Sequence, residues 1–479
     1  MSELHDLSAL DLAAAVRAGA VSPTEVLEHT LERARRIGPT VGAFVHVAEE
    51  HAREQARAAA EHLARRGAED DPLPPFLGVP CPVKDLTMVA GLPFEAGSAA
   101  LAGYVAPADD GVTTLLREAG TLMVGKTTTP ELGLPPYTEP DVAAPARTPW
   151  DLARGAGGSS GGAAAAVAAG IVPVAHGNDG GGSIRIPAAV CGLVGLKPSR
   201  GRVSKGPLGV DGAGLTADGV LTRTVRDTAA FLDVLARPWP GDPYVLPPPG
   251  TTYLDACDRG PGALRIGVLL EPVNVAGAPV HPAAVAAVER AVRLLEELGH
   301  HVEPTVVPFT PEQWDAFRPL WAVGALSAPV PPERDGLLVP LTRWMRDQGR
   351  TVTALEHAEA LGAVQRLARQ AATTWAGLDV VLTPTLAQPP VPVGAMRDDA
   401  DPVADFEAQK AFTPWTSAWN ITGAPAISVP LHRADVDGAR LPFGVQLGAV
   451  GTGQEELLLA LAAQLEEADP WPAFAPGVA

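Results

Sequence analysis

Three residues of this chain, Lys84, Ser159 and Ser183, have the types and surroundings that serine-based attack on a carbonyl compound requires. Both serines lie in glycine clusters within the stretch "GAGGSSGGAAAAVAAGIVPVAHGNDGGGSIRIP" (155–187). Glycine costs conformational entropy on folding, so such clusters mark backbone that bends unusually or comes close to another group. A ligand, a phosphate or a reacting carbonyl would each explain that close approach.

Ser183 is the candidate nucleophile because three consecutive glycines precede it. Consecutive glycines can direct successive backbone N–H groups toward one point, which forms a nest for negative charge. Attack on a carbonyl develops such a charge on oxygen, and preorganised donors stabilise it. The candidate oxyanion donors are the backbone amides of Gly180, Gly181, Gly182 and Ser183.

Lys84 is the candidate base. The chain has five lysines among its 36 basic residues, and Lys84 lies in the apolar stretch "FLGVPCPVKDLTMVAG" (76–91). A lysine that burial has made neutral can accept the proton that a serine nucleophile must lose. Ser159 could relay this proton between Ser183 and Lys84. A salt-bridged or snorkelling lysine would explain the same stretch equally well.

Two other motif matches are set aside. Residues 120–127 fit the P-loop pattern, but residues 122–124 resemble a strand within the loop, and Pro130 disfavours the helix that must follow. Residues 157–161 fit the nucleophile elbow of other hydrolases, but no strand leads into them and no histidine stands in a pattern that marks a base. No metal-ligand motif is present, and we expect neither a metal nor a cofactor.

Composition limits the class of protein. The chain has 479 residues, 46% of them apolar, and a formal net charge of −19, which disfavours a nucleic-acid partner. No apolar stretch approaches the roughly 18 residues of a membrane span, and the N-terminus lacks a secretory pattern. Three widely spaced cysteines argue against a disulfide framework. We therefore expect a cytoplasmic protein without a membrane partner.

The elements that must position these residues follow from the hydrophobic pattern. Ser22, Pro23 and Glu25 form a capping box that starts a helix running to about residue 37. A strand, a helix and a strand over 263–309 form a βαβ unit, which predicts some parallel sheet. The other expected helices are 161–170 and 452–468, and the other expected strands are 76–85, 120–126, 171–177, 378–385 and 424–431. The proline-rich stretch 237–253 is either a linker or a surface excursion.

The longest of these motifs resembles the amidase signature family. It is "GGSSGGAAAAVAAGIVPVAHGNDGGGSIRIPAAVCGLVGLKPS" (157–199), and the likeness continues upstream in "GVPCPVKDL" and "GKTTTPELG". Downstream it includes "TPWTSAWNITGAPAISVP" and "PFGVQLGAVGTGQEELLLALAAQLE". Residues 205–370 are the part of the chain where the likeness is weakest. Within the family, the wording is most like that of members resembling 6-aminohexanoate-cyclic-dimer hydrolases.

The resemblance implies a Ser–Ser–Lys triad, with Ser183 as nucleophile, Ser159 as the bridging serine and Lys84 as base. It also implies an α/β fold with a large, mixed, mostly parallel twisted sheet covered on both faces by helices. One domain would span 1–479, with a catalytic core at about 70–235 and 370–470. The segment of about 236–370 would be more variable and could form a pocket wall or flap.

The expected reaction is hydrolysis of a carboxamide C–N bond through an acyl-enzyme. Linear or cyclic amide oligomers, aryl amides, esters and carbamates (urethanes) are all chemically adjacent small-molecule substrates. Two alternatives remain: a glutamine amidotransferase subunit that releases ammonia for a partner protein, and a binding protein that has lost activity. The resemblance also allows a homodimer.

The chain departs from the commonest family pattern at two positions near the nucleophile. Asn178 stands where many members carry threonine, and Gly180 stands where a larger residue is frequent. These changes leave the chemistry intact but could reshape the oxyanion loop or the acyl side of the pocket. We expect residues 309–350 and 412–420 to form pocket walls.

Three aromatic residues are candidates for substrate contact: Trp415, Trp419 and Tyr137. Packing in the core would explain the two tryptophans at least as well, since buried aromatic residues are common in domains of this size.

Overall fold

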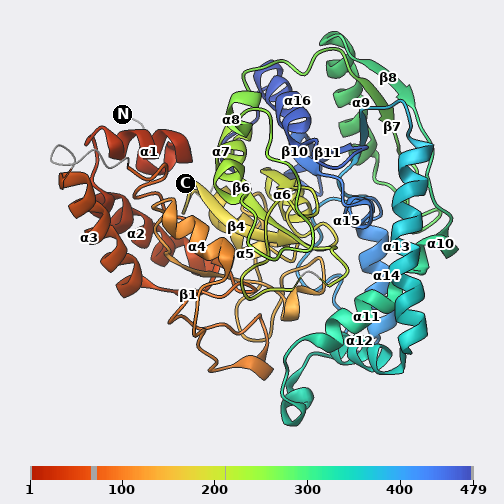
Figure 1. The fold of residues 1–479 in the computed structure, drawn as a ribbon, viewed down its shortest axis with the longest axis horizontal. Coiled ribbons are helices and arrows are strands. Elements are labelled where there is room, and N and C mark those ends of the chain that lie inside the picture. The colour runs from red at the N-terminus through yellow and green to blue at the C-terminus, as the bar shows by residue number, and fades with distance from the viewer. Residues whose placement is uncertain (1–2, 66–72, 211, 476–479) are drawn as a thin grey trace.

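The computed structural model describes residues 3–65, 73–210 and 212–475. Within these ranges the strands form a three-stranded and an eight-stranded sheet, surrounded by helices (Figure 1). The strands are β1 (Phe44–Val47), β2 (Val83–Lys84), β3 (Gly125–Thr127), β4 (Val174–Asp179), β5 (Val194–Lys197), β6 (Ala217–Thr222), β7 (Arg265–Val268), β8 (His301–Pro304), β9 (Val380–Pro384), β10 (Ala426–Val436) and β11 (Ala439–Ala449).

The α-helices are α1 (Ala9–Arg17), α2 (Pro23–Val41), α3 (Glu49–Arg65), α4 (Gly111–Glu118), α5 (Gly161–Ala168), α6 (Arg185–Cys191), α7 (Val225–Leu235), α8 (Tyr253–Ala256), α9 (Pro282–Glu297), α10 (Pro311–Asp315), α11 (Arg318–Ser327), α12 (Pro340–Thr351), α13 (Ala354–Thr374), α14 (Pro402–Phe412), α15 (Ala418–Thr422) and α16 (Glu455–Ala468). Short 3₁₀ helices are η1 (Leu4–Asp6), η2 (Ala99–Leu101), η3 (Glu131–Gly133) and η4 (Pro332–Leu337).

The large sheet has the order β4-β6-β5-β10-β11-β9-β7-β8, and the expected mixed α/β architecture is confirmed. The expectation that it is mostly parallel was wrong. Among the described residues, five of its strand pairs are antiparallel and only β7–β8 and β7–β9 are parallel. The predicted βαβ unit, β7-α9-β8, accounts for one of these two pairs, but a hairpin occupies the centre of the sheet.

That central hairpin joins β10 to β11 through Asp437 and Gly438, which have φ angles of 50° and 84°. Positive φ at both central residues is the geometry of a type I′ turn, whose twist matches that of the flanking strands, and Asp-Gly is one of its preferred sequences. The sequence analysis recognised β10 but not β11. The Asp-Gly pair was the signal that could have identified it.

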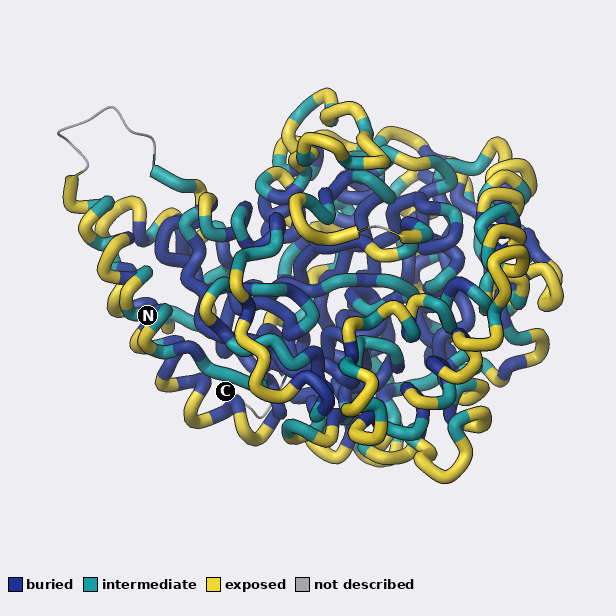
Figure 2. The backbone as a smooth tube through the Cα atoms, turned by 60° about the horizontal axis from the view of Figure 1, so that its bottom comes forward, coloured by how far each residue is buried: buried dark blue, intermediate teal, exposed yellow. Residues whose placement is uncertain are grey.

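Helices cover both faces of this sheet, as expected. Successive side chains of a strand point to opposite faces. On β10, Ile427 and Val429 face the core formed with α7, α9 and α16. Ser428, between them, faces the other layer, in which Ala189 of α6 packs on Gly444 of β11. Figure 2 shows buried residues concentrated in the interior and exposed ones along outer loops and helix faces.

The small sheet, of order β1-β3-β2, carries Lys84 at the end of β2. The strand expected over 76–85 is much shorter, because Pro80 and Pro82 lack the N–H that a continuous ladder requires. The discarded P-loop match is structural: Lys126 on β3 makes a buried ion pair with Asp85 at 2.8 Å.

The predicted capping box is confirmed. The side chains of Ser22 and Glu25 each bond to the other's backbone, and α2 begins at Pro23. The proline-rich stretch 237–253 runs over the surface, where Ser204 Oγ donates to Asp242 Oδ1 at 2.8 Å.

Core packing around β11 leads to a stability prediction. A Cβ placed on Gly448 would lie 1.8–2.1 Å from indole atoms of Trp419, which is fully buried. Gly448→Ala should therefore lower the free energy of unfolding by about 1–3 kcal/mol through overpacking. Urea denaturation followed by tryptophan fluorescence measures this loss. The matched control is Gly324→Ala on α11, where no atom lies within 4 Å and the change should be neutral or stabilise by up to about 1 kcal/mol. Equal stability of the two variants would contradict this account of the core.

Candidate active site

The amine of Lys84 and the hydroxyl of Ser159 are in direct contact. Lys84 Nζ donates to Ser159 Oγ at 2.7 Å and to Asn178 Oδ1 at 2.7 Å. The lysine side chain is fully buried, and Ser159 is 1% exposed. Two of the three residues predicted to act together are thus within hydrogen-bond distance.

The surroundings of Lys84 favour its neutral form. Burial lowers its pKa from 10.5 to about 7, although the more distant Asp179 and Asp218 partly oppose this shift. Among the described residues no carboxylate lies within ion-pair distance of Nζ, whereas Lys126 has Asp85 as a partner. The salt-bridged and snorkelling alternatives therefore do not describe Lys84.

A chain of polar contacts fixes the backbone beside this lysine. The Lys84 N–H donates to His176 Nδ1 at 3.4 Å, and His176 Nε2 lies 3.3 Å from Asp218 Oδ1. Because Nδ1 accepts a hydrogen bond, Nε2 carries the proton and donates to the carboxylate. Asp218 also accepts from Lys205 Nζ at 2.6 Å. The strand that ends in Lys84 is thus fixed to β4 and β6.

The contact of Asn178 with Lys84 was missed by the sequence analysis, which noted Asn178 only as a departure from the family pattern. His176 and Asn178 are two positions apart on β4, so they point to the same side of the strand. This period of two was the signal that both residues face the lysine.

The glycine loop that precedes Ser183 is built on a buried carboxylate. Asp179 receives two hydrogen bonds from Arg185, at 2.9 Å each, and accepts from the backbone amides of Gly182 and Ile184 at 2.8 and 3.2 Å. Both charged side chains are fully buried. Burial alone raises the pKa of Asp179, but Arg185 outweighs it and keeps this pKa at about 2. The expected supporting role of these two residues is confirmed.

Segments distant in sequence hold the same loop from its other side. Asn420 Nδ2 donates to the carboxylate and to the backbone oxygen of Asp179, both at 2.9 Å. Thr416 Oγ1 donates to the Gly181 carbonyl at 2.7 Å. Residues 412–420 thus orient the loop as well as contributing to the cavity wall.

The predicted oxyanion donors are not equivalent. The Gly182 amide donates to Asp179 within the loop, so it is already engaged. The amides of Gly180, Gly181 and Ser183 have no acceptor among the described residues. These three remain the candidate donors to a ligand.

Ser183 lines a cavity of about 410 Å³ together with Gly180 and Gly181. Its hydroxyl makes no hydrogen bond to any described residue, Ser159 included. The structure therefore joins Lys84 to Ser159 and places Ser183 on the cavity wall, with the last link of the predicted relay unformed.

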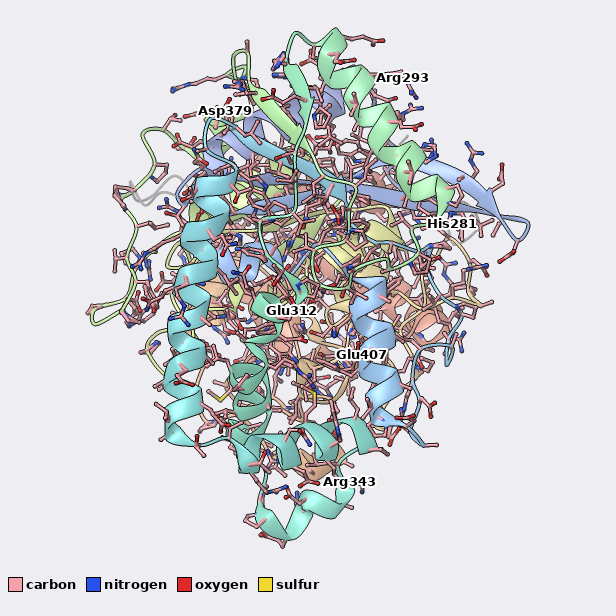
Figure 3. The ribbon with its side chains drawn as sticks, turned by 90° about the vertical axis from the view of Figure 1, so that its right-hand side faces the viewer. His281, Arg293, Glu312, Arg343, Asp379 and Glu407 are labelled. Carbon is pink, nitrogen blue, oxygen red and sulfur yellow. The ribbon has the colours of Figure 1, made fainter. Side chains whose placement is uncertain are left out.

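The cavity is lined mainly by residues of α10, α11, α12 and α14 (Figure 3, where Arg343 marks α12 and Glu407 marks α14). Its aromatic wall consists of Trp314, Phe317, Trp321, Trp344 and Phe406. The expectation that the stretch 309–350 forms a pocket wall is therefore correct in position.

The three aromatic residues predicted to contact substrate lie instead in the core. Trp415 and Trp419 are fully buried, and their indole N–H groups donate to the backbone oxygens of Glu271 and Ala449. Tyr137 is 5% exposed, and its hydroxyl donates to Asp405 at 2.6 Å. Satisfied polar groups in packed surroundings account for all three, and none of them lines the cavity.

Comparisons with known proteins agree with this site. The family model for amidases (Amidase) matches residues 25–459. A putative amidase from Synechocystis sp. is 40% identical over 98% of this chain and 89% of its own length. The 6-aminohexanoate-cyclic-dimer hydrolase of Paenarthrobacter ureafaciens is 37% identical over 96% of this chain and 94% of its own. A solved 6-aminohexanoate cyclic dimer hydrolase in complex with its substrate superposes with a TM-score of 0.89, at 33% identity over the full length of both chains. The chain belongs to the amidase signature family.

Two searches of the described residues returned nothing. No described helix has the length and hydropathy needed to cross a membrane. Within residues 3–65, 73–210 and 212–475, no group of three or more His, Cys, Asp or Glu side chains is placed to hold a metal ion.

The contact of Asn178 with the lysine amine predicts how the two groups are coupled. Asn178→Asp places a carboxylate next to Nζ, which should raise the pKa of Lys84 and move the rise of kcat/KM to higher pH by about one unit or more. Asn178→Ala removes an acceptor that favours the protonated amine, so the profile should move to lower pH. Profiles of kcat/KM against pH measure both shifts, and shifts of the same sign would contradict the contact.

Proposed function

We propose that this chain hydrolyses carboxamide C–N bonds through an acyl-enzyme on Ser183, with Lys84 as the base and Ser159 as the proton relay. Membership of the amidase signature family makes the chain a C–N hydrolase. The observation that carries the assignment of roles is the buried Lys84 amine, which has no carboxylate partner within the described residues and bonds directly to Ser159. A structural lysine would have no reason to remain unpaired there.

The proposed steps follow from these positions. Neutral Lys84 takes a proton from Ser159 as Ser159 takes one from Ser183, and the Ser183 oxygen forms a bond to the amide carbon. The amides of Gly180, Gly181 and Ser183 hold the developing oxyanion. The relay then returns the proton to the leaving nitrogen as the C–N bond breaks. Water cleaves the ester by the same route and restores the serine.

The cavity favours substrates that are largely apolar around the scissile amide. Five aromatic side chains line it, with charged groups only at Asp315, Arg318 and Lys410. Linear or cyclic aminohexanoate amides and aryl amides suit such a wall, and relatives are named for the cyclic dimer. Esters and carbamates would use the same acyl chemistry.

The glutamine amidotransferase alternative is not carried forward, because the relatives that match 96–98% of the chain are named as an amidase and a hydrolase. Two finer expectations, a cytoplasmic location and a homodimer, stay predictions.

The role of the lysine predicts a pH dependence with a definite sign. The base must be neutral, and Lys84 is protonated below its pKa of about 7. The value of kcat/KM should therefore rise as pH increases through about 7 and level off above it. Initial rates with a p-nitroanilide between pH 5 and 9 test this, with Lys84→Met as the inactive reference. A profile that is flat across this interval would be inconsistent with Lys84 as the base.

The nucleophile can be located directly. Treatment with a fluorophosphonate probe followed by peptide mass mapping should place the label on Ser183. Ser183→Ala should lower kcat on the order of 10³-fold or more, as loss of a nucleophile does in other serine hydrolases. The control is Ser160→Ala, whose hydroxyl donates to the Asn178 carbonyl at 3.4 Å and not to Lys84, and it should retain activity within about 10-fold. A label on Ser159 or Ser160 would refute the assignment.

A further inference from the structure

Trp321 lies directly against the two glycines of the candidate oxyanion loop. A Cβ placed on Gly180 would lie 3.7 and 3.8 Å from Cη2 and Cζ3 of Trp321, and one placed on Gly181 would lie 3.8 Å from Cη2. Both glycines and Trp321 line the cavity beside Ser183. The benzo edge of the indole thus occupies the space next to the loop into which a side chain at position 180 would extend.

On its other side, Gly180 is confined by β6 and the residues that lead into it. The same Cβ position lies 3.2 Å from Thr216 Oγ1, which is tighter than ordinary van der Waals contact. A branched side chain at 180 therefore has nowhere to extend without displacing Trp321 or Thr216. The bare backbone at 180 and the indole at 321 fit together.

Trp321 is held in this place by the packing of α11 on α12 (Figure 1). Gly349 of α12 lies so close to α11 that a Cβ there would be 2.5 Å from the Ala322 carbonyl. Arg346 donates to the carbonyls of Ala325 and Leu326 at 2.9 and 3.1 Å, which secures the end of α11. The indole therefore belongs to a fixed wall, since the helix that carries it cannot retreat without losing these contacts.

We propose that Trp321, together with the absence of a side chain at Gly180, sets the steric limit beside the scissile carbonyl and selects acyl groups that are unbranched at the α-carbon. The inference rests on the proposed function, because it assumes that the acyl group is carried on Ser183. The carbonyl stays at the oxyanion loop through both half-reactions, whereas the amine departs after the first. A wall packed against this loop therefore acts on the acyl group in both steps.

The substrate class that follows is the amide of a straight-chain acid, with methylene groups next to the carbonyl. One misplaced methyl group in a shaped pocket changes kcat/KM by about 10–200-fold. An α-methyl branch, as in an isobutyramide, would meet the indole edge, whereas a butyramide of the same carbon number would pass beside it.

The test compares butyryl and isobutyryl p-nitroanilides as substrates of the full-length protein. The wild type should prefer the butyryl compound by about 10-fold or more in kcat/KM. Trp321→Ala should bring this ratio close to one, mainly by raising turnover of the isobutyryl compound. Trp344→Ala is the matched control: Trp344 lines the same cavity but packs on Phe406, with ring centroids 5.6 Å apart, and its loss should leave the ratio unchanged. An unchanged ratio in Trp321→Ala, or an equal change in Trp344→Ala, would overturn the proposal.

A double-mutant cycle tests the fit of the two positions. Gly180→Thr alone should lower kcat/KM for the butyryl compound by about 10-fold, because its branches meet the indole. In the Trp321→Ala background the same change should cost several-fold less, since the space is then free. Effects that simply multiply would contradict the coupling. Thermal unfolding of each variant separates loss of fold from loss of fit.

A second substrate series assigns the wall to the acyl side. With the acyl group fixed as butyryl, n-butylamide and sec-butylamide should keep the same ratio of kcat/KM in the wild type and in Trp321→Ala. A change confined to this series would place the wall on the amine side and overturn the proposal. The failure of the proposed function is distinct, since it would appear as full activity of Ser183→Ala on the butyryl compound.

Discussion

A lysine amine buried without a carboxylate partner is the constraint on which this site depends. Moving an ammonium group out of water is costly unless it is paired, so a buried lysine without a counter-ion adopts its neutral form more readily. The fold maintains this condition at Lys84: β2 ends within the protein, and the nearest polar atoms are a hydroxyl and an amide oxygen. A group that is inert as a cation at the surface becomes a base near neutral pH.

A second buried group, the Asp179 carboxylate, solves the opposite problem. It remains charged because Arg185 pairs with it in two-pronged geometry, and it spends its remaining capacity on two backbone amides of the glycine loop. The loop is thereby fixed before any substrate arrives, which is the condition for effective stabilisation of an oxyanion. Thr416 and Asn420 extend this control to a segment more than 230 residues away in sequence.

The sequence predicted the parts of the site that are local and chemically unusual. Lys84 stood out as a rare lysine in an apolar stretch, and the glycine clusters marked Ser159 and Ser183. Residues whose roles depend on packing between distant segments were not predicted correctly. Trp415 and Trp419 looked like pocket residues, but their indole N–H groups find backbone acceptors at Glu271 and Ala449, which no local pattern reveals. The pocket wall was located only as the stretch 309–350, because its orientation comes from the packing of α11 on α12.

The fold shows the same division. The βαβ unit was predicted from the alternation of apolar runs, and its parallel pair is present. The direction of the remaining pairs was not, because it depends on which strands meet in the sheet, and the missed hairpin at Asp437 and Gly438 sets the antiparallel centre. Asn178 was visible as a departure from the family, but its meaning appeared only when Lys84 was found beside it.

The most direct test of the account is the titration of Lys84 itself. Because the chain has five lysines, protein labelled with ¹³C at lysine Cε should give few enough signals to assign with Lys84→Met and Lys197→Met variants. The account predicts that the Lys84 signal titrates near pH 7, more than three units below an ordinary lysine. A Lys84 signal that stays in its protonated position up to pH 10 would contradict the claim that this amine is the base.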